Sequence, residues 1–194
     1  MPRLTSEPSA VLRDQALHLM LSTHGSAIVL VTLGDTSMVP HLKGGDAVLA
    51  VPEMASPGWG DLVLYRQSDY WVVHRCLGRV VARDGRAGLR TRGDGRNVLD
   101  PLLAAEDVLA RVTAVRRGGV WRSLEGRKAR TYSYLVAGHD LFWATAGVVG
   151  RKVGLGRAVA AMDHVSLRLS VPLAFPLFHR RIARPAVSGP DEAV

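Results

Sequence analysis

The chain of 194 residues is 47% hydrophobic and carries a formal net charge of +8. This length fits one domain of ordinary size, or one domain with a tail, and the apolar content supplies a core, which excludes a chain that is disordered throughout. The one cysteine, Cys76, excludes an internal disulfide framework, and without a cluster of cysteines and histidines the sequence predicts no metal and no other cofactor.

The first predicted element is a short amphipathic helix over residues 8–24. Apolar residues recur there at helical spacing, at Leu12, Ala16, Leu19 and Met20. Gly25 then follows as a stop signal.

Short runs rich in β-branched and aromatic residues follow this helix. They cover residues 27–33, 46–51, 61–66, 70–82, 88–93 and 108–115. Gly, Pro, Asp and Ser separate them every eight to fifteen residues, a spacing typical of a compact all-β barrel or sandwich. Gly-Asp pairs at 45–46, 60–61 and 93–94 are predicted turns, in which glycine supplies a positive φ and aspartate bonds the local backbone.

The strand pattern ends near residue 125. Residues 131–150 are mixed and apolar, and residues 154–170 carry a helical stripe of Leu155, Val159, Met162, Val165 and Leu169. Two prolines make residues 171–181 unsuited to a regular helix throughout, and the last nine residues are expected to fray. We therefore predict a mainly β fold with an N-terminal helical segment (1–25), a β-rich core (26–125) and an α-rich, basic C-terminal extension (126–194).

The positive charge is concentrated in that extension. Residues 1–125 carry 15 Lys/Arg against 13 Asp/Glu, whereas residues 126–194 carry 10 against 4. Such an asymmetry is typical of a contact with anionic lipid or nucleic acid, and equally of a solvated basic surface. No basic face rich in aromatic residues is evident, so nucleic-acid binding is not expected.

No segment of the sequence approaches the ~20 apolar residues that span a bilayer. The first 25 residues also lack the basic start, apolar middle and small-residue cleavage site of a secretory signal. We expect a cytoplasmic protein, or one held peripherally against a membrane. The stretch 154–170 could then lie on that membrane, pack on the core, or grip a substrate protein.

Serine, histidine and aspartate occur in the β-rich core in an order that suits nucleophilic catalysis. Ser37 follows a predicted strand, His74 ends the apolar run "YWVV", and Asp94 and Asp100 lie in the turn-rich "RGDGRNVLD". A serine hydroxyl needs a base to take its proton, and a carboxylate orients a histidine base. Spacing alone leaves open a second interpretation, in which His74 is an ordinary half-buried strand residue. The remaining candidates lack comparable surroundings: His41, His139, His164 and His179.

Five phrases together resemble the type I signal peptidase family and its relatives, the self-cleaving repressor peptidases. In order they are "SMVPHLKGGDAVLA", "GWGDLVLYR", "WVVHRCLGRV", "LRTRGDGRNVLDP" and "VLARVTAV", and the resemblance covers roughly residues 30–116. The phrase "VVHR" is similar to the archaeal, endoplasmic-reticulum and sporulation-type members, whose base is histidine. No lysine occurs between Lys43 and Lys128, so the core offers no Ser–Lys dyad.

The resemblance implies a signal-peptidase-like β core and a serine endopeptidase that removes a signal or leader peptide. Ser37 would be the nucleophile and His74 the general base. Asp100 matches the position of the family's acid best, and Asp94 is the second choice. The precursor would bind as an extended strand, with small side chains before the cut.

The resemblance also assigns the surroundings of the nucleophile. The Ser37 backbone N–H would be one oxyanion donor, Met38 would line the pocket for the residue before the scissile bond, and Pro40 would shape the turn. Core packing is the alternative for Met38. The chain departs from the family where Asp35 and Thr36 precede the serine in place of glycine, which leaves the second oxyanion donor unassigned.

Two further functions compete with the endopeptidase. A regulatory, self-cleaving protein of the repressor type would need a helix-turn-helix domain, and about 25 residues precede the strands, which is too few. A non-catalytic binding module could keep the same core without cleaving anything.

Overall fold

The computed structural model describes residues 10–32, 35–52, 57–67, 70–96, 98–163, 165–166 and 178–185. Their elements in chain order are α1 (Ala10–His24), β1 (Ala27–Leu30), β2 (Ala47–Pro52), β3 (Leu62–Gln67), β4 (Tyr70–Val81), β5 (Ala87–Arg92), the 3₁₀ helix η1 (Ala105–Asp107), β6 (Val108–Arg117), β7 (Val120–Ser123), α2 (Arg127–Lys152) and β8 (Arg181–Ile182). A further helical segment covers residues 156–163.

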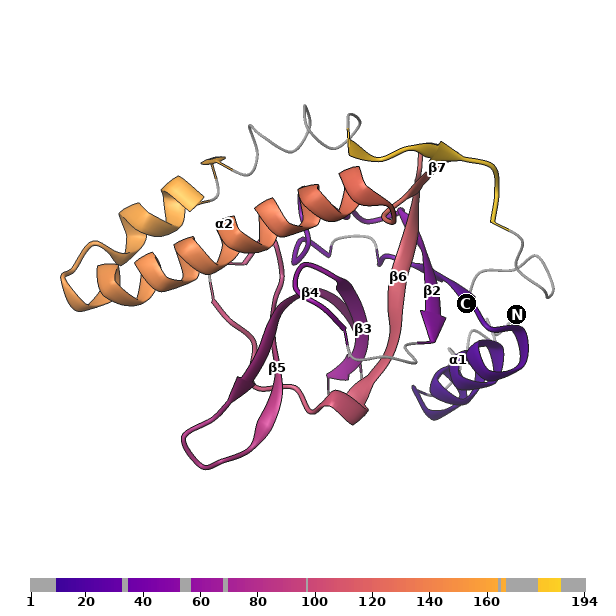
Figure 1. Cartoon of the computed structure of the whole chain (residues 1–194), viewed down its shortest axis with the longest axis horizontal. Helices are drawn as coiled ribbons and strands as arrows, with labels where there is room; N and C mark the ends of the chain where they lie inside the picture. The colour runs from indigo at the N-terminus through magenta and orange to yellow at the C-terminus, as the bar shows by residue number, and fades with distance from the viewer. Residues whose placement is uncertain are drawn as a thin grey trace, which may run out of the picture.

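The strands form one antiparallel sheet in the order β1-β2-β6-β3-β4-β5, and β7 pairs with β6 and β8. β1 and β5 are the two ends of this path and do not pair with each other, so the sheet formed by the described strands is open. Helices contribute about as much of the structure as strands do. The expected β-rich core is therefore present as a strongly curved sheet (Figure 1), but the fold is mixed rather than mainly β and is not a closed barrel.

α1 ends where the sequence predicted. Gly25 adopts a φ of 67°, and its N–H donates to the Leu21 carbonyl at 3.1 Å, which closes the last turn. Among residues 15–24 of the helix, whose side chains the structure describes, Leu17 and Leu21 are buried and pack against Ala50, whereas Leu19 is 65% exposed. The buried stripe of α1 is thus shifted from the predicted one.

α2 lies across one end of the curved sheet (Figure 1). Tyr132 and Val136, from its first half, share a core cluster with Val48, Leu62 and Val112 of the sheet. The helical extension that begins at residue 126 is therefore packed into the same core as the strands. No helix in the described part of the chain combines the length and apolar content needed to cross a bilayer.

The segment 156–163 folds back along the second half of α2 (Figure 1). Glycine permits this close approach, because a side chain at Gly150 would come within 2.9 Å of Val159 Cγ2. Gly154, with a φ of 79°, makes the turn between the two helices. The predicted stripe of 154–170 can be followed only to Val165, and the predictions for residues 171–177 and 186–194 lie outside the described residues.

Candidate functional site

His74 and Asp100 lie at hydrogen-bond distance in the interior of the sheet. His74 sits within β4, directly opposite Val63 of β3, and is 1% exposed. Its Nδ1 is 2.6 Å from Oδ2 of Asp100, which comes from the loop after β5. The carboxylate accepts the Nδ1 proton and so leaves Nε2 as the basic nitrogen of the ring.

Asp100 is held in place by two further donors. The Thr91 hydroxyl donates to its Oδ2 at 2.9 Å and the Tyr65 hydroxyl at 3.3 Å, and its own N–H bonds the Thr91 carbonyl. Burial alone would raise the pKa of Asp100, but the hydrogen bond and charge of His74 and the bonds from Thr91 and Tyr65 outweigh it and hold the pKa below its usual value. Asp100 is thus an ionised, oriented partner for the imidazole.

The opposite nitrogen of His74 faces the turn that carries Ser37. Nε2 is buried and accepts no hydrogen bond from any described group. A side chain added at Gly93 would come within 2.9 Å of this nitrogen and 2.5 Å of the Ser37 carbonyl oxygen, so both atoms border the same small space. Ser37 itself is 8% exposed. The structure therefore brings His74 and Asp100 into contact and sets Ser37 beside them, without a hydrogen bond from the serine hydroxyl to the base.

The main chain around Ser37 is fixed from two sides. The Gly95 N–H donates to the Ser37 carbonyl at 2.7 Å, which joins the serine turn to the loop that leads to Asp100. The Ser37 N–H donates to Oδ1 of Asp35 at 2.8 Å. The expected oxyanion donor is therefore occupied by a carboxylate from the same chain.

Asp94, the second choice for the acid, has different partners. Its carboxylate accepts two hydrogen bonds from Arg75, from Nε at 2.9 Å and from Nη2 at 2.7 Å. Both side chains are almost completely buried. Burial favours the neutral acid, but Arg75 and His41 dominate and hold the pKa of Asp94 far below its usual value. Asp94 is thus a buried anion paired with arginine, away from His74 Nδ1.

His41 belongs to this second cluster, contrary to the expectation that it lacked suitable surroundings. Its Nε2 is 2.7 Å from the Tyr132 hydroxyl, and its Nδ1 is 2.7 Å from Asp94 Oδ2 without the alignment of a hydrogen bond. Burial lowers the pKa of His41, and the neighbouring Asp94 offsets only part of that effect. Sequence reasoning also missed Arg75, although it stands next to His74 in "VVHR".

Met38 and Pro40 are both buried in the serine turn. Met38 is 3% exposed, belongs to the cluster that contains Leu42, and accepts the Asp94 N–H at its sulfur at 3.4 Å. These contacts favour the packing alternative for Met38. Pro40 lies in the same turn and follows a cis peptide bond from Val39.

The remaining histidines lie elsewhere. His139, on α2, contacts the Ser166 hydroxyl at 2.7 Å, and His179 is buried against the ring of Tyr132. His164 is outside the described residues. In the part of the chain that the structure describes, no group of three or more His, Cys, Asp or Glu side chains could hold a metal ion.

A buried arginine fastens the helical hairpin to the strand that leads into the site. Arg92, the last residue of β5, is fully buried and donates to the Asp140 carbonyl at 2.5 Å and to the Asp163 carboxylate. Its Nε also donates to the Arg96 carbonyl. Arg92 thus joins α2 and segment 156–163 to the loop that carries Asp94 and Asp100.

Asp140 should make the protein less stable as the pH rises. Burial and the charge of Asp94 raise its pKa to about 7, although His139, Arg92 and Arg75 lower it in part. Between about pH 4 and 7 the folded state keeps a proton that the unfolded chain releases, so the free energy of unfolding falls across this range. Asp140→Asn, which mimics the protonated acid, is expected to be more stable than the parent at pH 8 by on the order of 4 kcal/mol.

Urea unfolding at pH 5 and pH 8 measures this difference. The gain should be smaller at pH 5, on the order of 1–2 kcal/mol, because most of the interval between the unfolded and the folded pKa of Asp140 lies above that pH. Asp107→Asn, at an exposed carboxylate of η1, is the matched control. An unchanged pH slope in Asp140→Asn would show that Asp140 is ionised throughout.

Comparison with known proteins does not assign the chain to a family. No protein-family model matches the chain, and a search of curated proteins finds no match. The interpretation of the site therefore rests on its geometry and on the sequence motifs.

Proposed function

We propose that the chain is a serine endopeptidase with a signal-peptidase-like core, which removes a signal or leader peptide from a precursor. The observation that carries this proposal is the 2.6 Å contact between His74 Nδ1 and Asp100, together with a buried, unpartnered Nε2 beside the Ser37 turn. A carboxylate on one ring nitrogen and a nucleophile at the other is the arrangement of an acyl-transfer site.

The chemistry assigns a role to each side chain. His74 Nε2 takes the proton from the Ser37 hydroxyl as its oxygen bonds to the peptide carbonyl carbon, and Asp100 stabilises the imidazolium. His74 then returns that proton to the leaving amine, and a water molecule attacks the acyl-enzyme by the same route in reverse. In apo sites the serine–histidine bond is often long and forms only with substrate, so its absence is compatible with these roles.

The oxyanion of this reaction needs the Ser37 N–H. In the resting state that donor holds Asp35, so the substrate carbonyl must displace a carboxylate before attack. We expect the precursor to bind as an extended strand with small side chains before the cut, and the chain to act in the cytoplasm or at a membrane surface. The hydrogen bond from the Ser37 N–H to Asp35 lies in the Asp35-Thr36 segment, where the sequence departs from the family pattern.

A non-catalytic binding module is the second candidate. It is favoured by the same occupied donor and by the missing hydrogen bond between Ser37 and His74, because a binding module needs neither. The two candidates differ in whether the Ser37 hydroxyl reacts.

A fluorophosphonate probe carried on an extended leader-type peptide, whose additional contacts can displace Asp35 as a precursor would, tests that difference. Ser37 should be labelled as one adduct in the intact protein mass, and Ser37→Ala should take up none. Ser133→Ala, at a half-buried serine of α2, is the matched control and should label like the parent. A parent protein that stays unlabelled while a control protease reacts would favour the binding module, and cleavage of the purified chain itself would favour the repressor type.

A further inference from the structure

α2 has a second face that the core does not use. The buried face consists of Ala129, Tyr132, Val136, Ala137, Asp140, Ala144, Gly147 and Gly150. Seven large apolar side chains are exposed on the opposite side: Tyr134, Leu135, Leu141, Phe142, Val148, Val149 and Val153, which directly follows the helix. Successive pairs recur at intervals of seven residues and Val153 follows Val149 by four, so they form one continuous stripe, called here the outer stripe.

The outer stripe is unusually open to solvent. Leu135 is 62% exposed, and Phe142 and Val153 are each 63% exposed. Exposed apolar residues are ordinary when scattered, but a contiguous patch of this kind marks a surface that meets another apolar surface.

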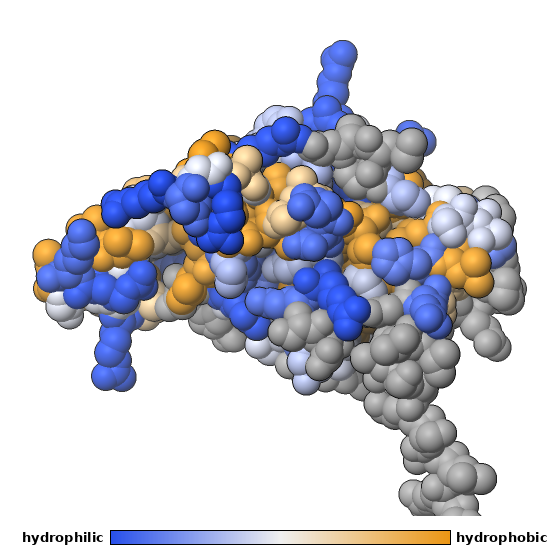
Figure 2. Space-filling view, turned by 90° about the horizontal axis from the view of Figure 1, so that it is seen from below, coloured by the Kyte–Doolittle hydropathy of each residue, from blue (hydrophilic) through white to orange (hydrophobic). Residues whose placement is uncertain are grey.

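Further exposed apolar side chains lie on the rest of the helical hairpin. Leu155, at the turn, and Met162 and Val165, on the segment that returns to the middle of α2, are each more than half exposed. Figure 2 shows hydrophobic side chains gathered at this end of the molecule, on the left, with hydrophilic side chains projecting between them. The apolar surface therefore runs along α2 and over the tip of the hairpin.

The exposed charges on α2 itself have one sign. Exposed cations stand at both ends of α2: Arg127, Lys128 and Arg130 at its start, Arg151 and Lys152 at its finish. The one acid of α2, Asp140, is completely buried. Arg157 adds another exposed cation beyond the turn. An apolar stripe between cations, with no exposed acid on the helix, is typical of a helix that lies in the interface of an anionic membrane.

A second copy of the chain fits this surface less well. Paired stripes would bring the basic ends of two α2 helices together in either direction, because both ends carry the same sign. Like charges brought together at an interface oppose association. An anionic lipid surface instead complements both ends at once.

We propose that the outer stripe and the hairpin tip dock on anionic lipid, with the helix axis in the plane of the membrane. Arg127, Lys128 and Arg130 at one end and Arg151 and Lys152 at the other meet the headgroups, while Phe142 and its neighbours enter the acyl boundary. This surface is independent of the chemistry at Ser37, so Ser37→Ala should bind lipid like the parent.

Co-sedimentation with vesicles tests the proposal. The full chain is used, because Tyr132 and Val136 of α2 belong to the core and truncation at residue 125 would expose it. Vesicles of phosphatidylcholine with phosphatidylglycerol should bind the protein, vesicles of phosphatidylcholine alone should bind it about tenfold less, and added salt should weaken the binding.

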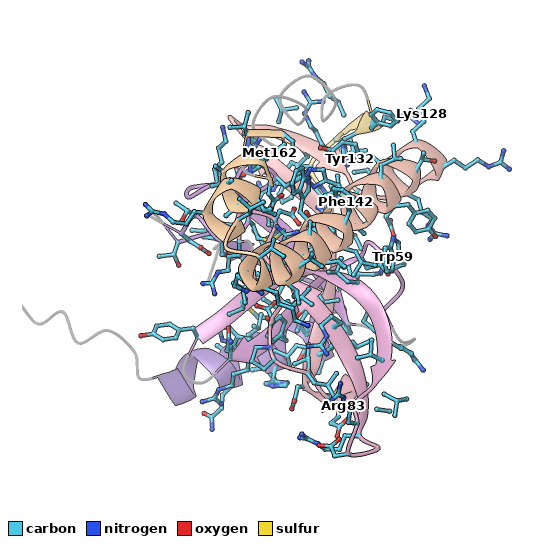
Figure 3. All side chains as sticks on the ribbon, turned by 90° about the vertical axis from the view of Figure 1, so that its left-hand side faces the viewer. Trp59, Arg83, Lys128, Tyr132, Phe142 and Met162 are labelled. Carbon is cyan, nitrogen blue, oxygen red and sulfur yellow. The ribbon has the colours of Figure 1, made fainter. Side chains whose placement is uncertain are left out.

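Two pairs of variants separate the apolar and the charged contributions. Phe142→Asp should lower binding about tenfold, whereas Val81→Asp, at a valine of β4 that is also well exposed, should not. The double change Arg130→Glu with Lys152→Glu should also lower binding, and Arg83→Glu should not. Arg83 lies at the opposite end of the view in Figure 3 from Lys128, Phe142 and Met162, which makes it a suitable control.

Three outcomes would overturn the proposal. The first is no binding to anionic vesicles, and the second is equal binding to both kinds of vesicle. The third is a stable dimer in lipid-free solution that Phe142→Asp converts to a monomer, because the stripe would then be covered by a second copy.

Discussion

Replacement of His74 by glutamine is expected to lower the rate of peptide cleavage by about 10⁴-fold or more while the protein stays folded. Glutamine keeps a polar side chain near Asp100 but cannot take a proton from Ser37, so the loss should fall on kcat rather than on KM. The measurement is cleavage of a leader-type peptide that the parent protein cuts, followed by mass spectrometry, with circular dichroism as the check on folding.

His41→Gln is the matched control for this loss. His41 is equally buried and also lies beside an aspartate, but it faces Arg75 and Tyr132 rather than the serine turn. Its replacement should lower stability and leave the kcat of the folded protein within about tenfold of the parent. Asp100→Asn should lower kcat strongly, because the amide no longer selects the Nδ1–H tautomer. Equal activity of His74→Gln and the parent would remove His74 from the mechanism.

Asp94→Ala is expected to be the most destabilising of the substitutions considered. It leaves the Arg75 guanidinium buried and without its carboxylate, a change that costs about 3–5 kcal/mol when one partner of a buried pair is removed. The contribution of Asp94 to the free energy of unfolding depends on pH in a defined direction. Arg75 and His41 depress the pKa of Asp94, so its contribution is present above the ordinary carboxyl range and is lost as the pH falls. Urea unfolding near neutral pH measures the effect.

The double variant Arg75→Met with Asp94→Leu is the control for this prediction. With both charges gone, no buried ion is left unpaired, so much of the lost stability should return. If Asp94→Ala and the double variant were equally unstable, shape rather than charge would explain the loss. If Asp94→Ala were as stable as the parent, the pair would contribute nothing to the fold.

The sequence predicted two of its three Gly-Asp turns well. Gly45 and Gly60 both adopt a φ of 87°, and the carboxylates of Asp46 and Asp61 accept N–H groups three residues back in the chain. These features are local, since a positive φ and a short-range hydrogen bond follow from the dipeptide itself.

The third pair, Gly93-Asp94, shows where local reasoning stops. Asp94 reaches Arg75 across the sheet, and Gly93 is required because Ser37 and His74 approach its α-carbon, not because of a positive φ. Such contacts depend on the pairing of strands far apart in the chain. For the same reason spacing alone left Asp94 and Asp100 as alternatives, and it did not identify Thr91 and Tyr65 as hydrogen-bond donors to Asp100.

The sequence predicted an α-rich extension after residue 125 but assigned no helix to residues 131–150, for a different reason. This stretch of α2 is apolar on two sides of the helix, so the single hydrophobic stripe that identifies an amphipathic helix is absent. One side packs into the core and the other forms the outer stripe. The second apolar face, which obscures the helical pattern in the sequence, is thus the same face that forms the outer stripe.

In the resting site the Asp35 carboxylate accepts the Ser37 N–H and so competes with a substrate carbonyl for that donor. The carboxylate is tethered two residues from the donor, so its effective concentration is fixed by the chain and does not fall on dilution. For acyl transfer at Ser37, a small ester or amide with few other contacts would rarely displace it. A long precursor segment has additional contacts whose binding free energy can do so, and selectivity for extended substrates would then begin at the oxyanion donor itself.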